Sequence, residues 1–111
     1  MWTYDKGKTP SILRIAGWNA NGVRSLFNQR RLIPYLEKNS IDIICLSETK
    51  IDYEAYQKSP IVIHGYSGYW NFCKCSAGYS GVAVFSKYLP ISMKEDLPDP
   101  RHCKEGRMIT L

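Results

Sequence analysis

The chain has 111 residues, of which 44% are apolar and 23% are charged, so it is long enough for one small globular domain with one core and too short for two. Fifteen Lys and Arg residues exceed ten Asp and Glu residues, and the net charge of +5 favours an anionic partner such as nucleic acid. No apolar run reaches the length of a membrane span and the N-terminus lacks the apolar stretch of a signal peptide, so we expect a soluble, intracellular protein.

The chain begins with a polar stretch that is followed by a strand. Residues 1–10 are polar and end at Pro10, so we expect a flexible N-terminal arm ahead of one domain over residues 11–111. β-branched and apolar residues bounded by Pro10 and Gly17 predict a strand over Ser11–Trp18. The next four residues, NANG, are typical of a turn.

Apolar residues recur at helical spacing between Val23 and Lys38. Pro34 interrupts this pattern, because it lacks an amide donor and cannot lie deep inside a helix. We therefore predict two short helices, the first ending at about Phe27 and the second beginning near Gln29. Pro34 then falls close to the first turn of the second helix, where proline is tolerated.

A second strand is predicted over Ile41–Ser47, where the nearly continuous apolar run is typical of an interior strand buried on both faces. A strand, a helical crossover and another strand form a right-handed unit with parallel strands. Because parallel strands end at the same edge of a sheet, we expect Asn19 and Asn21 to lie near Glu48 at that edge.

The second half of the chain predicts shorter elements. Residues 52–58 form one or two helical turns, an aromatic-rich strand is centred on Gly68–Lys74, and residues 82–87 form a strand that pairs antiparallel with it. A further strand is suggested at 91–97, and residues 107–111 begin another. Because the chain ends inside an element, without a cap or turn, we expect it to be truncated.

The four cysteines are expected to be reduced. Cys45 lies in an apolar run, where a thiol behaves as a small hydrophobe, and Cys73 and Cys75 point to the same face if they lie in a strand. The alternative is a zinc site formed by Cys73, Cys75, His102 and Cys103. Its C-x-C and H-C pairs depart from the usual ligand spacing, which disfavours zinc.

The residues at the strand ends supply hard oxygen ligands. The Glu48 carboxylate and the Asn21 carboxamide are of the kind that Mg²⁺ prefers, with water and phosphate filling the remaining positions. Lys50, Arg24 and the amides of the GYSG loop are suited to hold a phosphate. The alternative is structural, since Asn and Gly in a turn serve backbone geometry and a Glu at the start of a loop often caps a helix.

Four sequence blocks, RIAGWNANGVRS, DIICLSETK, GYSGVAVFSK and EGR, occur in that order between Arg14 and Arg107. Together they resemble the amino-terminal half of the exonuclease III-type abasic-site (AP) endonucleases, in the endonuclease/exonuclease/phosphatase superfamily. The resemblance covers nearly the whole chain. It implies an α/β (α+β) fold that is one half of a DNase I-like α/β sandwich, with a mixed sheet and short helices on one face.

The same resemblance implies roles for individual residues. Asn19 matches the asparagine that supports the reaction centre, Asn21 the Asp or Asn near the metal, and Glu48 the glutamate that ligates Mg²⁺, with Mn²⁺ as an alternative. The positions that match contacts with DNA phosphates are Arg24, Lys50, Gly78 and Tyr79. The implied reaction is hydrolysis of the phosphodiester 5′ to an abasic site in duplex DNA, as in base excision repair, with 3′-phosphodiesterase or 3′ to 5′ exonuclease activity.

The chain also departs from the family pattern. The family tyrosine on the phosphate, the Asp-x-Asn pair that positions the attacking water and the closing Asp and His have no counterpart before Leu111. His64 and His102 lie in the wrong blocks to replace that histidine. We therefore expect the chain alone to be inactive. We also expect it to be poorly soluble without the C-terminal half of the domain, which would cover one face of its sheet.

Three interpretations stay open at this point. The first is an AP endonuclease, in the nucleus or mitochondrion of a eukaryote or the cytoplasm of a bacterium. The second is a retroelement endonuclease, or a phosphoinositide or sphingolipid phosphodiesterase, of the same superfamily, although the EGR and GYSGVA strings favour the repair enzymes. The third is a non-catalytic truncated product that binds DNA. The branch of the family is also open, because SPIVIHGYSGYWNF resembles the second eukaryotic branch and the short connection from Lys87 to Glu105 resembles the first and the bacterial enzymes.

Overall fold

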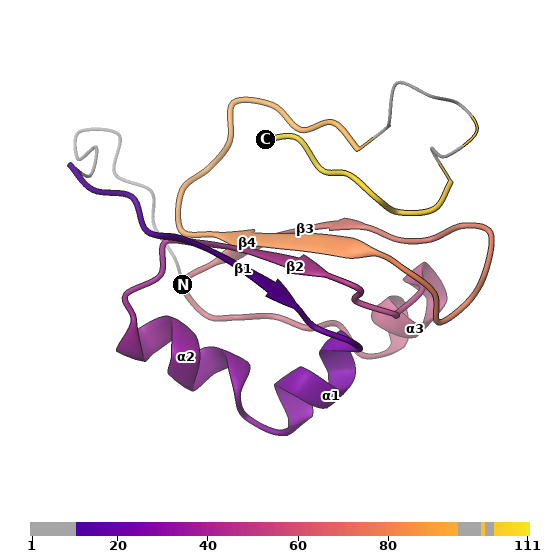
Figure 1. Cartoon of the computed structure of the whole chain (residues 1–111), viewed down its shortest axis with the longest axis horizontal. Coiled ribbons are helices and arrows are strands. Elements are labelled where there is room, and N and C mark those ends of the chain that lie inside the picture. Colours follow the sequence, from indigo (N-terminus) through magenta and orange to yellow (C-terminus); the bar gives the residue numbers. More distant parts are fainter. Residues whose placement is uncertain (1–10, 96–100, 102–103) are drawn as a thin grey trace.

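The computed structural model describes residues 11–95, 101 and 104–111, and its strands form one mixed sheet (Figure 1). Within these residues the elements are β1 (Ile15–Asn19), α1 (Val23–Asn28), α2 (Leu32–Lys38), β2 (Ile43–Ser47), α3 (Tyr53–Lys58), β3 (Ser67–Asn71) and β4 (Val82–Ser86). The strand order is β1-β2-β4-β3, with β1 parallel to β2 and the other two pairs antiparallel. The parallel crossover and the antiparallel pairing of the last two strands confirm the sequence predictions. The expected N-terminal arm lies outside the described residues.

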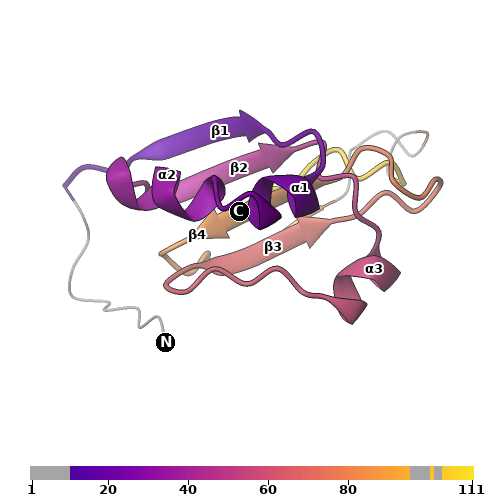
Figure 2. The ribbon, with the colours of Figure 1, turned by 90° about the horizontal axis from the view of Figure 1, so that it is seen from below.

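Helices α1 and α2 lie against one face of this sheet, and the C-terminal segment, residues 104–111, runs across the other (Figures 1 and 2). This confirms the expected mixed sheet with short helices on one face. The core forms between the helices and the sheet, where alternate residues of β2 and β4 meet the apolar side of each helix. The residues with almost no exposed surface at this interface are Val23, Leu32, Leu36, Ile44, Leu46 and Phe85.

The two-helix prediction is confirmed, and Pro34 lies in the first turn of α2. The second helix begins at Leu32 rather than near Gln29. Residues 29–31 form the connection instead, because Gln29 caps α1 and Arg30 has a left-handed backbone with φ of 55°. This break between the helices allows α1 and α2 each to turn an apolar side toward the sheet.

The strands are shorter than predicted because a strand can extend only as far as its partner. Strand β1 begins at Ile15, which pairs with Ile43, the first residue of β2. The prediction that β2 is buried on both faces is wrong, because Cys45 and Ser47 are exposed on the side away from the helices. Ile15 lies on this same face and is 61% exposed. The helix-free face of β1 and β2 therefore keeps exposed residues, although the C-terminal segment runs across this side of the sheet (Figure 1).

The strands suggested at 91–97 and 107–111 are reduced to one isolated bridge in the described residues. Lys94 and Thr110 exchange two backbone hydrogen bonds, of 2.8 and 2.6 Å between nitrogen and oxygen. Residues 96 and 97 lie outside the described part. The side chain of Asn71 fastens both segments to the sheet, since its Nδ2 donates to the carbonyls of Glu95 and Met108. Across the described ranges, no helix has the length and apolar character needed to cross a bilayer.

Candidate active site at the carboxyl edge of the sheet

The parallel strands β1 and β2 end side by side, with Asn19 paired to Ser47 in the register. The loops that follow continue this pairing. The amide of Ala20 donates to the Ser47 carbonyl at 2.8 Å, and the amide of Gly22 donates to the Glu48 carbonyl at 2.8 Å. The NANG and ETK loops are therefore held against each other by backbone hydrogen bonds. This confirms the prediction that both loops meet at one edge of the sheet.

Asn19 is the residue that joins the two loops through its side chain. Its Nδ2 donates to Oε2 of Glu48, and its Oδ1 accepts from the backbone amide of Asn21 at 3.0 Å. One carboxamide thus fixes both the direction of the carboxylate and the course of its own loop. A carboxylate whose position is set by a hydrogen bond is preorganised to bind a cation or to meet a reacting group.

A second contact between the loops joins Asn21 and Lys50. The Lys50 ammonium donates to Oδ1 of Asn21 at 2.7 Å. Asn21, Glu48 and Lys50 all have left-handed backbones, with φ of 44°, 50° and 52°. A non-glycine residue in this region costs on the order of 1 kcal/mol, and such strain is found where surrounding contacts hold a functional side chain in place. Here the backbone ladder and the side-chain contacts of Asn19 and Asn21 hold the loops.

The GYSG loop, residues 78–81, lies on the other side of the ETK loop. The amide of Thr49 donates to the Gly81 carbonyl at 3.0 Å, and the amide of Lys50 donates to the Ser80 carbonyl at 2.8 Å. Gly78 and Tyr79 are exposed at the tip of this loop. The ETK loop is therefore the centre of the site, since it is hydrogen-bonded to both neighbouring loops.

Arg107 is a further basic residue at this edge, and the sequence reasoning left it out of the candidate site. Its Nη2 donates to the Tyr79 hydroxyl at 2.5 Å, and its guanidinium lies over the Tyr79 ring, 5.1 Å from the centroid. It also pairs with Glu105 at 3.5 Å. The position of the EGR block after the GYSG block was the available signal, but only the fold shows that the two blocks touch.

A cavity of about 490 Å³ separates the helix-free face of the sheet from the C-terminal segment. Its lining includes Asn19 and Ser47 from the strand ends and Arg107 from the segment. Arg24 lies apart from this cavity, exposed on the first turn of α1. In the described residues this edge therefore combines the Glu48 carboxylate with the basic side chains of Lys50 and Arg107, of which Arg107 is paired with Glu105. A carboxylate with basic groups nearby is a charge pattern suited to a phosphate bound next to a metal ion.

The side chains at this edge fit a hard divalent cation only in part. Mg²⁺ often binds through one or two carboxylates and fills its other positions with water and phosphate oxygens, a pattern that Glu48 can support. The Oδ1 atoms of both asparagines already accept hydrogen bonds within the site. Among the described residues, no group of three or more His, Cys, Asp or Glu side chains could hold a metal. The zinc alternative thus has no support there, and its His102 and Cys103 lie outside the described residues.

Thr49 is fully buried at the centre of the site, and its Oγ1 has no hydrogen-bond partner in the described part of the chain. Replacing Thr49 by valine removes this unpaired hydroxyl, so we expect the free energy of unfolding to stay the same or rise by about 1 kcal/mol. Urea unfolding checks this, with Thr110→Val, at an exposed position, as the matched control. A loss of more than about 1 kcal/mol would mean that the hydroxyl has a partner, such as a water molecule.

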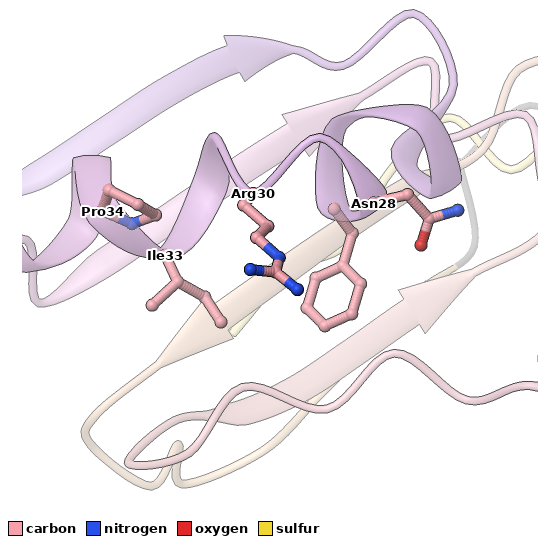
Figure 3. A pocket seen from close by; sticks show the side chains of 5 residues that line it. Asn28, Arg30, Ile33 and Pro34 are labelled. Atoms are coloured by element: carbon pink, nitrogen blue, oxygen red, sulfur yellow. The ribbon is translucent and has the colours of Figure 1, made fainter.

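A separate hollow of about 540 Å³ lies between α1 and α2, with the Arg30 guanidinium pointing into it (Figure 3). It is lined by Phe27, Asn28, Arg30, Ile33 and Pro34. No carboxylate lines it, so this hollow lacks the chemistry of the strand edge.

Comparison with known proteins agrees with this geometry. The model of the "Endonuclease/Exonuclease/phosphatase family" matches residues 16–111. An exodeoxyribonuclease of Bacillus subtilis (strain 168) is 38% identical over 99 residues, which cover 89% of this chain and 38% of the relative. A DNA-(apurinic or apyrimidinic site) endonuclease 2 of Bos taurus is 34% identical over 99 residues, which cover 78% of this chain and 19% of the relative.

Solved structures share the fold of this chain. The catalytic domain of Xenopus laevis APE2 has a TM-score of 0.70 and 29% identity, over 86% of this chain and 37% of that one. The AP endonuclease LMAP of Leishmania major has a TM-score of 0.73 and 27% identity, over 96% of this chain and 37% of that one. The chain thus spans about two fifths of these structures and of the Bacillus relative. The DNase I-like half-sandwich implied by the sequence blocks is confirmed as its fold.

Proposed function

The chain belongs to the endonuclease/exonuclease/phosphatase family, and we propose that it is the metal-binding part of a DNA-repair phosphodiesterase. The proposed reaction is hydrolysis of the phosphodiester 5′ to an abasic site in duplex DNA, with 3′ to 5′ exonuclease or 3′-phosphodiesterase activity beside it. The observation that carries this proposal is the Asn19–Glu48 contact at the carboxyl edge, with the Lys50 ammonium bound to Asn21 beside it. The names of the relatives, an exodeoxyribonuclease and an abasic-site endonuclease, support the substrate.

The proposed roles follow from the contacts at this edge. Glu48 would ligate Mg²⁺ or Mn²⁺, which supplies positive charge against the phosphate and the leaving oxygen. Asn19 keeps the Glu48 carboxylate in position and supports the reaction centre. Asn21 lies beside the metal and shares its Oδ1 with Lys50, so its role is to position the ammonium as well as the ion. The residues that would bind DNA phosphates are Arg24, Lys50, Gly78 and Tyr79.

Arg107 adds to these phosphate contacts in the proposal. It lines the same cavity as Asn19 and holds the Tyr79 hydroxyl by a hydrogen bond. Hydrolysis also needs a group that activates water, whereas Glu48 is assigned to the metal and Glu105 is paired with Arg107. We therefore infer that the 111-residue chain does not incise DNA by itself, and that the rest of a family domain completes the site. The proposed reaction would take place where such DNA is found, in a nucleus or mitochondrion or in bacterial cytoplasm.

An incision assay tests the proposal. A duplex with one abasic-site analogue and a labelled 5′ end is offered to the whole product of the gene and to the 111-residue chain, each with Mg²⁺ and with EDTA. We expect the whole product with Mg²⁺ to cut 5′ to the site and leave a 3′-hydroxyl that a polymerase extends, and the other three combinations to leave the duplex intact. The same duplex with a normal base is the control.

The outcomes separate the alternatives. Cleavage of the normal duplex at the same rate would favour a less specific nuclease, such as a retroelement enzyme. Hydrolysis of a phosphoinositide or sphingomyelin in parallel reactions, with the abasic duplex intact, would move the protein to the lipid phosphodiesterases. Retention of the abasic duplex in a gel shift by the whole product, without any cut, would identify a non-catalytic DNA-binding protein. Each of these results would contradict the proposed reaction.

A further inference from the structure

Cys73 and Cys75 form a close pair of thiols beyond the end of β3. Their sulfur atoms lie 3.3 Å apart. The predicted aromatic-rich strand is confirmed as β3, but it ends at Asn71 rather than Lys74, and residues 74–76 form a bend. In an extended strand two such residues would have Cα atoms roughly 6.6 Å apart, near the upper limit for a disulfide. The bend thus brings together two sulfurs that a strand would hold apart.

The two thiols have different tendencies to ionise. Burial acts to raise the pKa of Cys73, but hydrogen bonds from the Cys75 amide, the Cys75 thiol and the Ser76 amide outweigh it, so the net pKa is lowered. The pKa of Cys75 is raised, mainly because its thiol hydrogen-bonds to Cys73. Cys73 is therefore the sulfur that carries negative charge first, and Cys75 the one that keeps its proton. A thiolate next to a thiol is the arrangement of an attacking and a resolving cysteine.

Both sulfurs are within reach of a small reagent. Cys75 is exposed. Cys73 is only 7% exposed, but it lines a cavity of about 680 Å³ together with Trp70, Phe72 and Lys74. A molecule of the size of a peroxide fits the cavity easily.

The backbone around the pair is fastened to the C-terminal segment. The Lys74 amide donates to the Lys104 carbonyl at 2.7 Å, and Gly106 packs so closely on the Phe72–Cys73 peptide that a Cβ there would lie 2.7 Å from the Cys73 nitrogen. These contacts limit the motion of residues 73 and 74. The sulfurs are therefore preorganised as a pair, and little chain entropy is lost when they join.

We propose that Cys73 and Cys75 are an oxidation site for hydroperoxides, which convert the pair to an intramolecular disulfide. The Cys73 thiolate attacks one oxygen of the peroxide, the O–O bond breaks, and Cys73 becomes a sulfenic acid while hydroxide leaves. The Cys75 sulfur then attacks Sγ of Cys73 and loses its proton, the S–OH bond breaks, and water leaves. The peroxide is reduced by two electrons and the two thiols are oxidised by two. This site is separate from the strand edge and needs no metal ion.

Mass spectrometry tests the proposal on the whole chain. The reduced protein is treated with hydrogen peroxide, quenched with catalase, alkylated with N-ethylmaleimide and digested with trypsin. Because trypsin cuts after Lys74, the two cysteines fall in separate peptides, residues 59–74 and 75–87. We expect these two peptides to be joined in the oxidised sample and separately alkylated in the untreated one. Gel filtration before digestion keeps monomers only, so that the link is intramolecular.

Cys45 is the internal control. The Cys45 side chain is accessible, but neighbouring atoms partly shield its thiol from water and so raise its pKa. We therefore expect Cys45 to stay alkylated at a peroxide dose that joins the pair. Cys75→Ser should stop at the Cys73 sulfenic acid, which dimedone traps. Cys73→Ser should slow peroxide consumption by about tenfold or more, since the thiol that ionises first is gone. Cys103→Ser should leave the joined peptides unchanged.

Four results would overturn the proposal. They are an alkylated pair after oxidation, oxidation of Cys45 at the same dose, a disulfide that includes Cys103, and a Cys75→Ser protein in which dimedone labels no Cys73. Circular dichroism of each variant shows whether it is folded. The peptide analysis of the unsubstituted chain needs no variant, so a misfolded substitution does not decide the outcome.

Discussion

Replacing Glu48 by glutamine in the whole gene product is expected to lower the rate of abasic-site incision by at least about 100-fold at saturating Mg²⁺. Glutamine keeps the length of the side chain, and its carbonyl can accept the hydrogen bond that Asn19 Nδ2 donates to Glu48. The change therefore removes the negative charge with little change of geometry. Loss of a group that only orients a metal ligand costs roughly 10- to 100-fold, so loss of the ligand itself should cost at least the larger factor.

The matched control is Glu54→Gln. Glu54 is an exposed carboxylate on α3, where it pairs with Lys58 at 3.4 Å. The Glu54→Gln substitution removes the same charge at a position away from the strand edge. We expect the incision rate to stay within about twofold of that of the unsubstituted protein, because an exposed ion pair contributes little to stability. A titration with Mg²⁺ completes the test, since a lost ligand weakens the apparent affinity for the ion. Equal rates for Glu48→Gln and the unsubstituted protein at every Mg²⁺ concentration would remove Glu48 from the metal site.

Much of the fold could be predicted from the sequence because the signals are local. Hydrophobic periodicity identified α1 and α2 and the four strands, and Pro34 required a break between the helices. A strand, a helical crossover and a strand form a parallel pair whose strands end at the same edge, so the meeting of Asn19 with Glu48 followed from the order of the elements. Element boundaries did not follow as well, since the length of β1 depends on where β2 begins.

The remaining features of the site depend on contacts between segments far apart in the chain. Nothing in the ETK block indicates that Lys50 donates to Asn21, because that contact depends on left-handed backbones at both residues. Likewise the pairing of Arg107 with Tyr79 needs the C-terminal segment to cross the sheet face. The Cys73 and Cys75 sulfurs meet in a bend that their C-x-C spacing does not predict. Sequence spacing could assign residues to the carboxyl edge of the sheet. Which of these side chains touch depends on the conformation of the loops.

Gly106→Ala is expected to cause the largest loss of stability among single changes in the C-terminal segment. Gly106 has φ of 65°, and an added Cβ would lie 2.7 Å from three backbone atoms, those of Asn71 (O), Phe72 (C) and Cys73 (N). Backbone atoms cannot turn aside as a flexible side chain can. The left-handed conformation costs alanine about 1 kcal/mol and overpacking adds about 1–3 kcal/mol, so we expect the free energy of unfolding in urea to fall by about 2–4 kcal/mol.

Gly78→Ala separates these two causes. Gly78 has nearly the same φ, 69°, but a Cβ there would meet nothing within 4 Å, so only the conformational cost of about 1 kcal/mol remains. If Gly106→Ala instead releases the segment locally, the amide of Lys74 loses its bond to Lys104 and its hydrogen exchange speeds up. A loss of about 2–4 kcal/mol or faster exchange at Lys74 would each locate the close packing at Gly106, because neither result is expected of Gly78→Ala. Equal unfolding free energies for the two variants, with Lys74 protected in both, would mean that the segment does not pack on the Phe72–Cys73 peptide.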